Sequence, residues 1–428
     1  MRVTCKKSNF CGKFAPPVSK SEAARVIACA LLSDSPTRIE ALPSSDDAYA
    51  ALSCAKSLGA TYSDGLFVPP SEFPKSAILN CGESATCLRF FACITAAIGG
   101  EFTLIAEKSL LNRPMDDLAK SLASGGVTLE KTDGGWRVSG KLRAGKYYIG
   151  GSVSSQYLSG LLLALPVLGE GSVVVCKNLA SKSYVYETAR IMNKFSGRVI
   201  VRKPDEETDE YTVCGGKYSA KEPVSLALDW SGAAFFLTAG ALGGKVTALG
   251  LTKNMPDSQI ADVLVLAGAK VEKTTERDGR ADITASGGEL KPFSFDFTDC
   301  PDLVPVCAVL AACINGESEL KSLARLKTKE SDRVRSVGEL VRVLGAEAAF
   351  DGENLLVRGG KISGGEVKTY GDHRIAMAAS IAAAVSSGPI IIDDAECVKK
   401  SYYSFWRDYA ALGGIAERDL KKAEREEK

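Results

Sequence analysis

The chain has 428 residues, of which 45% are hydrophobic and 25% are charged, and its formal net charge is +1. This length predicts two domains of about 200 residues each, and the near-zero charge argues against nucleic acid as a partner. The thirteen cysteines form no CxxC pair and there is one histidine, so we expect buried reduced thiols, with no zinc site or disulfide framework.

Six helices rich in small apolar residues are predicted along the chain, at intervals of roughly 60–75 residues. Each begins with polar residues and continues as a nearly uniform apolar run, which is typical of a buried helix. They are SKSEAARVIACALL from Ser19, CGESATCLRFFACITAA from Cys81, SSQYLSGLLLALPVL from Ser154, DWSGAAFFLTAGAL from Asp229, PDLVPVCAVLAACI from Pro301 and GDHRIAMAASIAAAV from Gly371.

Two-stranded hairpins are predicted in step with these helices, several of them around an Asp-Gly turn. The segments begin at Gly59, Gly125, Ser196, Gly268 and Gly345, and a shortened sixth begins at Gly413. Each repeat is therefore predicted to contain, in order, a strand, a helix, a strand, a helix and a hairpin. An ordinary α/β enzyme with coincidental alanine-rich helices is the alternative interpretation.

The repeat predicts an α/β fold of two similar lobes, each with three βαβαββ units in an inverted, barrel-like arrangement with buried helices. The first lobe is expected over residues 14–223, and the second over residues 1–13 and 224–428. The opening residues would then pair with strands of the second lobe.

No membrane span is expected. The run from Ile375 to Asp393 is broken by Gly388-Pro389, which favours a buried helix followed by a strand. The segment MRVTCKKSNF lacks the apolar core of a signal peptide, so a cytoplasmic protein is expected.

Polar and charged residues gather at the starts of the six predicted helices. Unpaired backbone N–H groups and the helix dipole make such ends suitable for anions. The residues concerned are Lys20 and Ser21, Glu83 to Thr86, Ser154 to Gln156, Asp229 and Ser231, Asp302, and Asp372 to Arg374. Simple N-capping accounts for any one of them.

Basic residues accompany these helix starts: Lys20, Arg25, Arg89, Arg113, Lys329, Arg333, Arg374 and Lys400. Guanidinium groups suit phosphate and carboxylate, so the set favours small ligands with several negative charges. A solvated helix face is the alternative for Lys329 to Arg333, and a structural hydrogen-bonding role is the alternative for His373.

Nine segments resemble, in order and spacing, the signatures of the 5-enolpyruvylshikimate-3-phosphate synthase family, from about Pro16 to Phe405. They are PVSKSEAAR, CGESATCLRF, LNRPMDDL, GSVSSQYLSGLLLALP, ASKSY, CPDLVPVCAVLAA, RLKTKESDRV, YGDHRIAMA and DAECVKKSY. The resemblance implies two lobes that close on substrate, and transfer of the enolpyruvyl group from phosphoenolpyruvate to the 5-hydroxyl of shikimate 3-phosphate. It implies small-molecule partners, no metal or organic cofactor, and we expect a monomer.

The same resemblance implies the roles of particular residues. Shikimate 3-phosphate would be bound by Ser21, Arg25, Ser154, Ser155, Gln156, Ser181, Tyr184, Asp302 and Lys329. Phosphoenolpyruvate would be bound by Lys20, Ala85, Arg113, Gln156, Arg333, Arg374 and Lys400, with Glu83, Thr86 and His373 as further candidates. Glu330 would exchange a proton with the methylene carbon, Asp302 would accept the hydroxyl proton, and Lys20 would assist departure of phosphate.

Ala85 departs from the family pattern, which usually has glycine at this position, in the pocket for phosphoenolpyruvate and the inhibitor glyphosate. A methyl group there predicts weakened glyphosate inhibition. The rival interpretations are a UDP-N-acetylglucosamine enolpyruvyl transferase, an RNA 3′-phosphate cyclase-like protein and a catalytically inactive binding protein. The first of these begins with Lys-Asn, whereas Lys20 is followed by Ser21.

Overall fold

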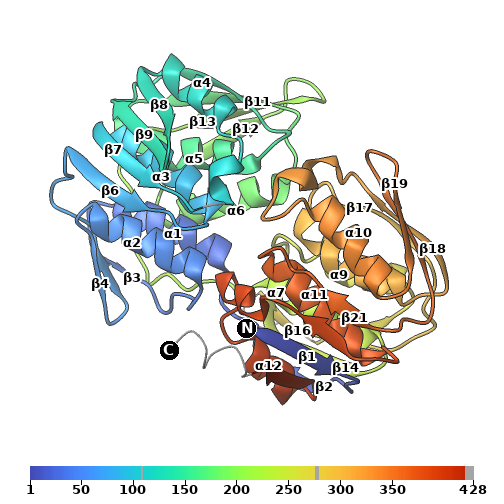
Figure 1. Cartoon of the computed structure of the whole chain (residues 1–428). Helices are drawn as coiled ribbons and strands as arrows, with labels where there is room; N and C mark the ends of the chain where they lie inside the picture. Colours follow the sequence, from blue (N-terminus) through green and yellow to red (C-terminus); the bar gives the residue numbers. More distant parts are fainter. Residues whose placement is uncertain (108, 275–278, 420–428) are drawn as a thin grey trace. The chain divides into compact units, whose positions relative to one another are not determined.

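The protein is described here by a computed structural model that covers residues 1–107, 109–274 and 279–419. The chain divides into two compact units: unit 1 contains Met1–Pro17 and Leu228–Lys428, and unit 2 contains Val18–Ala227 (Figure 1). The sequence prediction put these boundaries at residues 14 and 223, a few residues earlier in the chain.

Unit 2 contains three successive groups of helices and strands. In chain order its elements are α1 (Lys20–Leu31), β3 (Thr37–Arg38), α2 (Asp46–Ser57), β4 (Thr61–Ser63), β5 (Leu66–Val68), β6 (Ser76–Asn80), α3 (Ala85–Ile98), β7 (Gly100–Ile105), η1 (Leu110–Asn112), α4 (Asp116–Ser124), β8 (Val127–Thr132), β9 (Gly135–Gly140), β10 (Lys146–Gly150), α5 (Ser155–Ala164), η2 (Leu165–Leu168), β11 (Ser172–Lys177), α6 (Lys182–Lys194), β12 (Val199–Arg202) and β13 (Thr208–Val213).

Unit 1 repeats the same order of elements. They are β1 (Arg2–Lys6), β2 (Cys11–Phe14), α7 (Trp230–Ala241), β14 (Lys245–Thr252), α8 (Ile260–Leu266), β15 (Lys270–Lys273), β16 (Arg280–Ser286), β17 (Ser294–Asp296), η3 (Pro301–Leu303), α9 (Val304–Ala312), β18 (Gly316–Lys321), η4 (Ala324–Thr328), α10 (Arg333–Val343), β19 (Glu347–Phe350), β20 (Leu355–Gly359), β21 (Gly365–Val367), α11 (His373–Ile381), η5 (Ala382–Ala384), β22 (Ile390–Ile392), η6 (Ala395–Lys400), α12 (Phe405–Ala411) and β23 (Ile415–Asp419).

The sheets have a common pattern. Five sheets of the described chain have four strands, in the orders β6-β7-β9-β8, β10-β11-β13-β12, β2-β14-β16-β15, β17-β18-β20-β19 and β21-β22-β1-β23. In each, the first two strands are parallel and the others are antiparallel. This pattern confirms the predicted α/β fold and its hairpins, although the 275–278 turn lies outside the described residues.

Two repeats depart from the predicted order. The sheet of the first repeat has three strands, β3-β5-β4, and isolated bridges join Ser33 to Tyr218 and Ile39 to Val224. The fourth repeat takes its opening strand, β2, from the start of the chain. Residues distant in sequence therefore complete these repeats. The expected pairing of the opening residues with strands of the second lobe is confirmed, whereas the bridges to Tyr218 and Val224 were not predicted.

The predicted apolar helices form the interior of each unit. Helices α1, α3 and α5 contact one another in unit 2, and α7, α9 and α11 do so in unit 1. Every residue of α7 and of α9 is buried. A helix that is apolar on all sides is stable only where protein surrounds it, which explains these positions.

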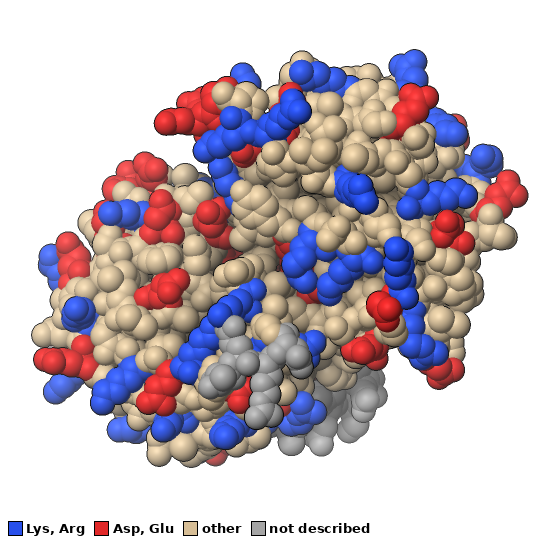
Figure 2. Space-filling view, turned by 180° about the vertical axis from the view of Figure 1, so that it is seen from behind, with Lys and Arg blue, Asp and Glu red and all other residues tan. Residues whose placement is uncertain are grey.

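The run Ile375 to Asp393 is a buried helix, α11, followed by strand β22, as predicted. Within the described residues, no helix has the length and apolarity that a membrane crossing requires. On the face drawn in Figure 2, both basic and acidic side chains are present among the uncharged ones.

Candidate active site

Most of the buried helices begin with a side-chain N-cap. Ser19, Ser84 and Ser154 cap α1, α3 and α5 of unit 2. Asp229 and Asp372 cap α7 and α11 of unit 1. Each cap satisfies one backbone N–H, and the other amides of the first turn remain oriented along the helix axis, where an anion can be bound.

Lys20 is the first residue of α1, and its ammonium group forms an ion pair with Asp47 of α2. Both side chains are only slightly exposed, at 15% and 13%. Asp47 was not recognised from the sequence, because its helix lacks the features of the buried set. The pair holds the Lys20 side chain against α2.

Arg25, one turn further along α1, is almost completely buried. Its guanidinium forms an ion pair with Glu187 at 3.1 Å and donates to the Thr188 hydroxyl at 2.8 Å. It also donates to the backbone carbonyls of Ser21 and Tyr184. Arg25 therefore joins α1 to α6, and its contact with substrate stays a prediction.

A second set of unit 2 residues, here called the Arg89 network, surrounds the start of α5. Arg89 donates to Gln156 Oε1 at 2.7 Å and to Ser154 Oγ at 3.1 Å. Gln156 in turn donates to the Thr86 hydroxyl at 2.8 Å. Arg89 was not among the residues assigned to a ligand, although it lies within the CGESATCLRF segment.

The remaining candidates of unit 2 occupy helix starts or the loops before them. Ser155 begins α5, Ser181 precedes α6 with a left-handed backbone (φ 56°), and buried Arg113 follows η1. Ala85 begins α3 and is buried. Glu83, in the loop before it, accepts a hydrogen bond from Ser109 at 3.2 Å.

In unit 1, one guanidinium connects three carboxylates, and we call this set the Arg333 cluster. Arg333 lies 2.6 Å from Asp302, 2.6 Å from Glu330 and 2.7 Å from Asp372. Arg374 binds the other oxygen of Asp302 at 2.8 Å, and Lys329 lies 3.4 Å from Asp302. The structure thus brings together five residues that the sequence assigned, and adds Asp372.

The charges of this cluster shift the pKa values of its members. Burial raises the pKa of Asp302, but the positive charges of Arg374, Lys329 and Arg333 outweigh burial and hold it well below its usual range. Burial lowers the pKa of Lys329, against the opposing effect of Asp302. Asp302 is therefore ionised at neutral pH and accepts hydrogen bonds only.

Asp257 is a buried carboxyl group in unit 1 that the sequence did not suggest. It accepts a hydrogen bond from Ser231, in the first turn of α7. Burial and the nearby charge of Asp302 raise the pKa of Asp257 to about 6. Its position was not predictable because the loop before α8 carries no motif.

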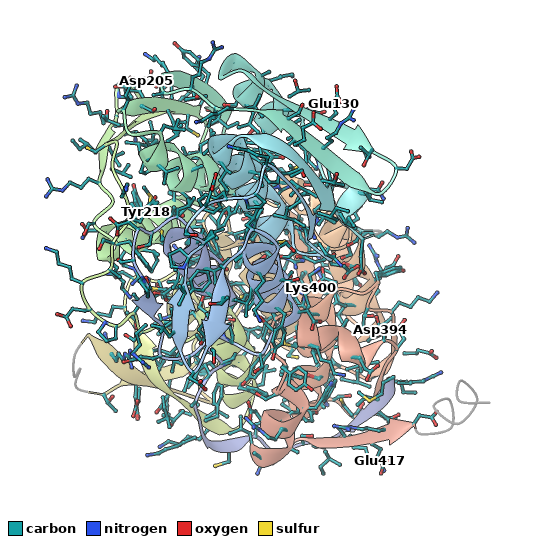
Figure 3. The ribbon with its side chains drawn as sticks, turned by 90° about the vertical axis from the view of Figure 1, so that its left-hand side faces the viewer. Glu130, Asp205, Tyr218, Asp394, Lys400 and Glu417 are labelled. Atoms are coloured by element: carbon teal, nitrogen blue, oxygen red, sulfur yellow. The ribbon has the colours of Figure 1, made fainter. Side chains whose placement is uncertain are left out.

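Two candidates remain: His373, which is next to Arg374 in the sequence, and Lys400, which ends η6. His373 is fully buried in the first turn of α11, so its role toward a ligand stays a prediction. Lys400 is buried at the end of η6, where Figure 3 labels it.

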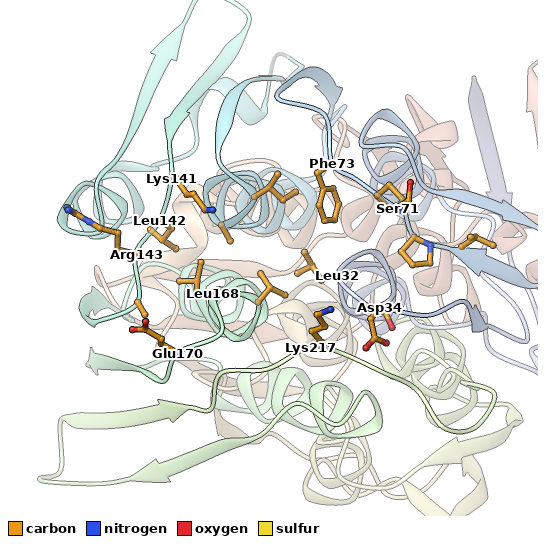
Figure 4. A pocket seen from close by; sticks show the side chains of 18 of the residues that line it. Leu32, Asp34, Ser71, Phe73, Lys141, Leu142, Arg143, Leu168, Glu170 and Lys217 are labelled. Carbon is orange, nitrogen blue, oxygen red and sulfur yellow. The ribbon is translucent and has the colours of Figure 1, made fainter.

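Unit 2 also has a cavity of about 890 Å³, drawn in Figure 4. Its lining includes Leu32, Ile98 and Leu168, which follow or end α1, α3 and η2. It also includes charges of both signs, among them Lys141, Arg143 and Glu170. The candidate residues lie at the starts of α1, α3 and α5, and η2 directly follows the end of α5, so the cavity is separate from the candidate site.

The fold defines the class of protein. It is similar to the structure of EPSP synthase from Acinetobacter baumannii, with a TM-score of 0.79, 24% identity and coverage of 97% of this chain and 100% of that chain. It is also similar to the enolpyruvyl transferase NikO from Streptomyces tendae, with a TM-score of 0.73, 18% identity and coverage of 97% and 98%. The chain therefore has the enolpyruvyl transferase fold.

The sequence identifies the family within that class. The sequence model described as EPSP synthase (3-phosphoshikimate 1-carboxyvinyltransferase) matches residues 5–409. Relatives named 3-phosphoshikimate 1-carboxyvinyltransferase include one from Thermococcus kodakarensis, 36% identical over 94% of this chain and 97% of the relative. One from Clostridium kluyveri is 34% identical over 94% and 95%. The chain belongs to the EPSP synthase family, and it is an enzyme of enolpyruvyl transfer in the shikimate pathway.

Proposed function

We propose that the chain transfers the enolpyruvyl group of phosphoenolpyruvate to the 5-hydroxyl of shikimate 3-phosphate, and that Asp302 and Glu330 exchange the protons. The observation that carries this proposal is that both carboxylates accept hydrogen bonds from Arg333, each at 2.6 Å. Addition followed by elimination requires one group that takes the hydroxyl proton and one that delivers a proton to carbon.

In the proposed addition step, Asp302 accepts the proton of the 5-hydroxyl while Glu330 protonates the methylene carbon of phosphoenolpyruvate. The hydroxyl oxygen then bonds to the neighbouring carbon, which gives a tetrahedral adduct. In the elimination step, Glu330 removes a proton from the new methyl group, the C–O bond to phosphate breaks, and Lys20 stabilises the departing phosphate.

The charges of the Arg333 cluster support a mechanism in which Asp302 becomes a stronger base when an anionic ligand binds. Before binding, Arg333, Arg374 and Lys329 lower the pKa of Asp302, and a carboxylate of very low pKa is a weak base. An anionic ligand on Arg333 and Arg374 would offset part of their positive charge. The pKa of Asp302 would then rise, so the base would strengthen when substrate is present.

The remaining ligand assignments are part of the same proposal. Ser21, Arg25, Ser154, Ser155, Gln156, Ser181, Tyr184, Asp302 and Lys329 would bind shikimate 3-phosphate. Lys20, Ala85, Arg113, Gln156, Arg333, Arg374 and Lys400 would bind phosphoenolpyruvate. Hydrogen bonds from Arg89 orient Ser154 and Gln156, which supports a positioning role for Arg89.

Phosphate release tests the choice of acceptor substrate. With phosphoenolpyruvate present, we expect release to require shikimate 3-phosphate and to be absent with shikimate, UDP-N-acetylglucosamine or ATP. Glu330→Gln should abolish turnover and retain binding of shikimate 3-phosphate, whereas Glu339→Gln, on the exposed side of α10, should behave as the parent. Turnover with UDP-N-acetylglucosamine would contradict the proposal.

We further propose that Ala85 weakens inhibition by glyphosate. Its methyl group is buried at the first position of α3, where it would crowd the longer inhibitor more than phosphoenolpyruvate. A clash of this kind provides roughly 1–3 kcal/mol of discrimination, or about 5- to 150-fold.

Inhibition constants for the parent chain and Ala85→Gly test this proposal. We expect the variant to be inhibited more strongly, by about 5- to 150-fold. Ala92→Gly in the same helix is the control for the destabilisation that a glycine causes within a helix. Its ratio of the glyphosate inhibition constant to the KM for phosphoenolpyruvate should match that of the parent. Equal sensitivity of the parent and Ala85→Gly would show that the loop absorbs the methyl group.

A further inference from the structure

Three cysteine thiols of unit 2 converge in its interior. Cys54 lies in α2, Cys81 directly follows β6, and Cys87 lies in the first turn of α3. All three side chains are buried, and their sulfur atoms lie within 4.8 Å of one another. Cys87 Sγ is 3.5 Å from Cys54 Sγ, and Cys54 Sγ is 4.0 Å from Cys81 Sγ.

These separations, of 3.5 Å, 4.0 Å and at most 4.8 Å, lie around the edge length of a trigonal metal–thiolate site. A metal–sulfur bond of about 2.3 Å places three sulfurs at the corners of a triangle with edges of about 4.0 Å. No fourth His, Cys, Asp or Glu among the described residues joins the group. A closed tetrahedral zinc site is therefore disfavoured, and three thiolates suit a soft ion such as Cu(I).

The surroundings of the three thiols support a metal–thiolate complex, which carries a net negative charge. Cys87 is in the first turn of α3, whose positive end partly compensates the negative charge of a thiolate complex. Other buried cysteines, such as Cys93 in the same helix, do not belong to this group. Simple packing of apolar thiols would not require three sulfurs from separate elements to meet.

We propose that Cys54, Cys81 and Cys87 form a site for one thiophilic metal ion, Cu(I) foremost, in trigonal coordination by three thiolates. Three metal–sulfur bonds form, the protons still held by the thiols pass to solvent, and no oxidation state changes. The ion would connect α2, which carries Asp47, to the segment from Cys81 to Cys87, which contains Glu83 and Ala85. The proposal does not depend on the reaction proposed above.

Anaerobic titration of the reduced chain with Cu(I), against a chromophoric copper chelator, tests this site. The Cys11→Ser background removes an exposed thiol that could bind copper elsewhere. We expect one tightly bound equivalent, and X-ray absorption should show three sulfurs at about 2.3 Å. The thermal midpoint should rise with Cu(I), because three preorganised thiolates bind the ion more tightly than the dispersed cysteines of the unfolded chain.

Cys54→Ser and Cys87→Ser should each lose the tight equivalent, whereas the matched control Cys93→Ser should retain it. If a serine variant does not fold, X-ray absorption of the copper-loaded Cys11→Ser chain still counts the sulfur ligands. Binding that is unchanged in the Cys54 and Cys87 variants, or a two-sulfur site, would overturn the proposal. So would a reduced chain that binds no tight equivalent and only forms a Cys54–Cys87 disulfide in air.

Discussion

The Arg89 network and the Arg333 cluster both place a buried guanidinium near a helix start, but they differ in the charge of its acceptors. Arg89 donates to the uncharged side chains of Ser154 and Gln156. Arg333 donates to the carboxylates of Asp302, Glu330 and Asp372. An anion that approaches Arg333 must compete with these carboxylates for the guanidinium. Pairing within the Arg333 cluster therefore depends more strongly on charge than pairing within the Arg89 network.

After the loss of turnover expected for Glu330→Gln, the next largest effect on the reaction is expected from Asp302→Asn. This change keeps the size of the side chain and removes a proton acceptor, so kcat should fall by about 10²- to 10⁴-fold. The KM for each substrate should change much less. Steady-state kinetics provide the measurement, with the exposed Glu317→Gln as control, and an unchanged kcat would remove Asp302 from the mechanism.

Arg333→Ala should produce the largest loss of stability, because it leaves several carboxylates without their shared cation. Breaking a buried ion pair by removing one partner costs about 3–5 kcal/mol of unfolding free energy. Arg335→Ala, which removes an exposed pair with Glu339 on the same helix, should cost less than about 0.5 kcal/mol. Denaturant unfolding of both variants tests the contrast, and similar losses would contradict it.

Asp257 should make the stability of unit 1 depend on pH. Because its pKa is raised from 3.8 to about 6, the folded chain holds this proton more tightly than the unfolded chain. Its favourable contribution is present below about pH 4 and is lost as the pH rises through 6.

Asp257→Asn should therefore be more stable than the parent at pH 7, by up to about 3 kcal/mol for a shift of two pKa units. Near pH 4 the two should be equally stable. Thermal unfolding across this range, with exposed Asp262→Asn as control, gives the comparison. A difference that does not vary with pH would show that the Asp257 carboxyl is not perturbed.

The smallest effect is expected from Arg89→Lys, which keeps the charge but replaces the planar guanidinium whose Nη1 donates to both Ser154 and Gln156. We expect KM to rise about tenfold, equivalent to one charge-assisted hydrogen bond. The exposed Arg137→Lys should leave KM unchanged. A fall in kcat with constant KM would instead indicate that Arg89 acts in the transition state.

The sequence predicted most of the fold because each repeat has its own local pattern. The buried helices from Ser19 to Gly371 and the hairpins are formed by neighbouring residues, so their periodicity was sufficient. The partners of β1 and β2 were not predictable in detail, because the strands that pair with them lie more than two hundred residues away in the sequence.

The candidate site was less predictable than the fold. Lys20, Asp302, Glu330, Arg333 and Asp372 lie in recognisable segments, but these segments do not show which residues contact one another. Asp47 meets Lys20, and Asp372 meets Arg333, only because separate helices pack together. Cys54, Cys81 and Cys87 likewise have no diagnostic spacing, and their convergence depends on the packing of α2 against α3.

The pairing of the opening strands has a consequence for synthesis of the chain. Arg2–Lys6 pairs with Ile390–Ile392 and with Ile415–Asp419, so a ribosome must make almost the whole chain before this strand finds its neighbours. At about 5–20 residues per second, unit 2 has time to fold first. The nascent N-terminal strand would meanwhile have unpaired edges, which makes it a candidate segment for chaperone binding during translation.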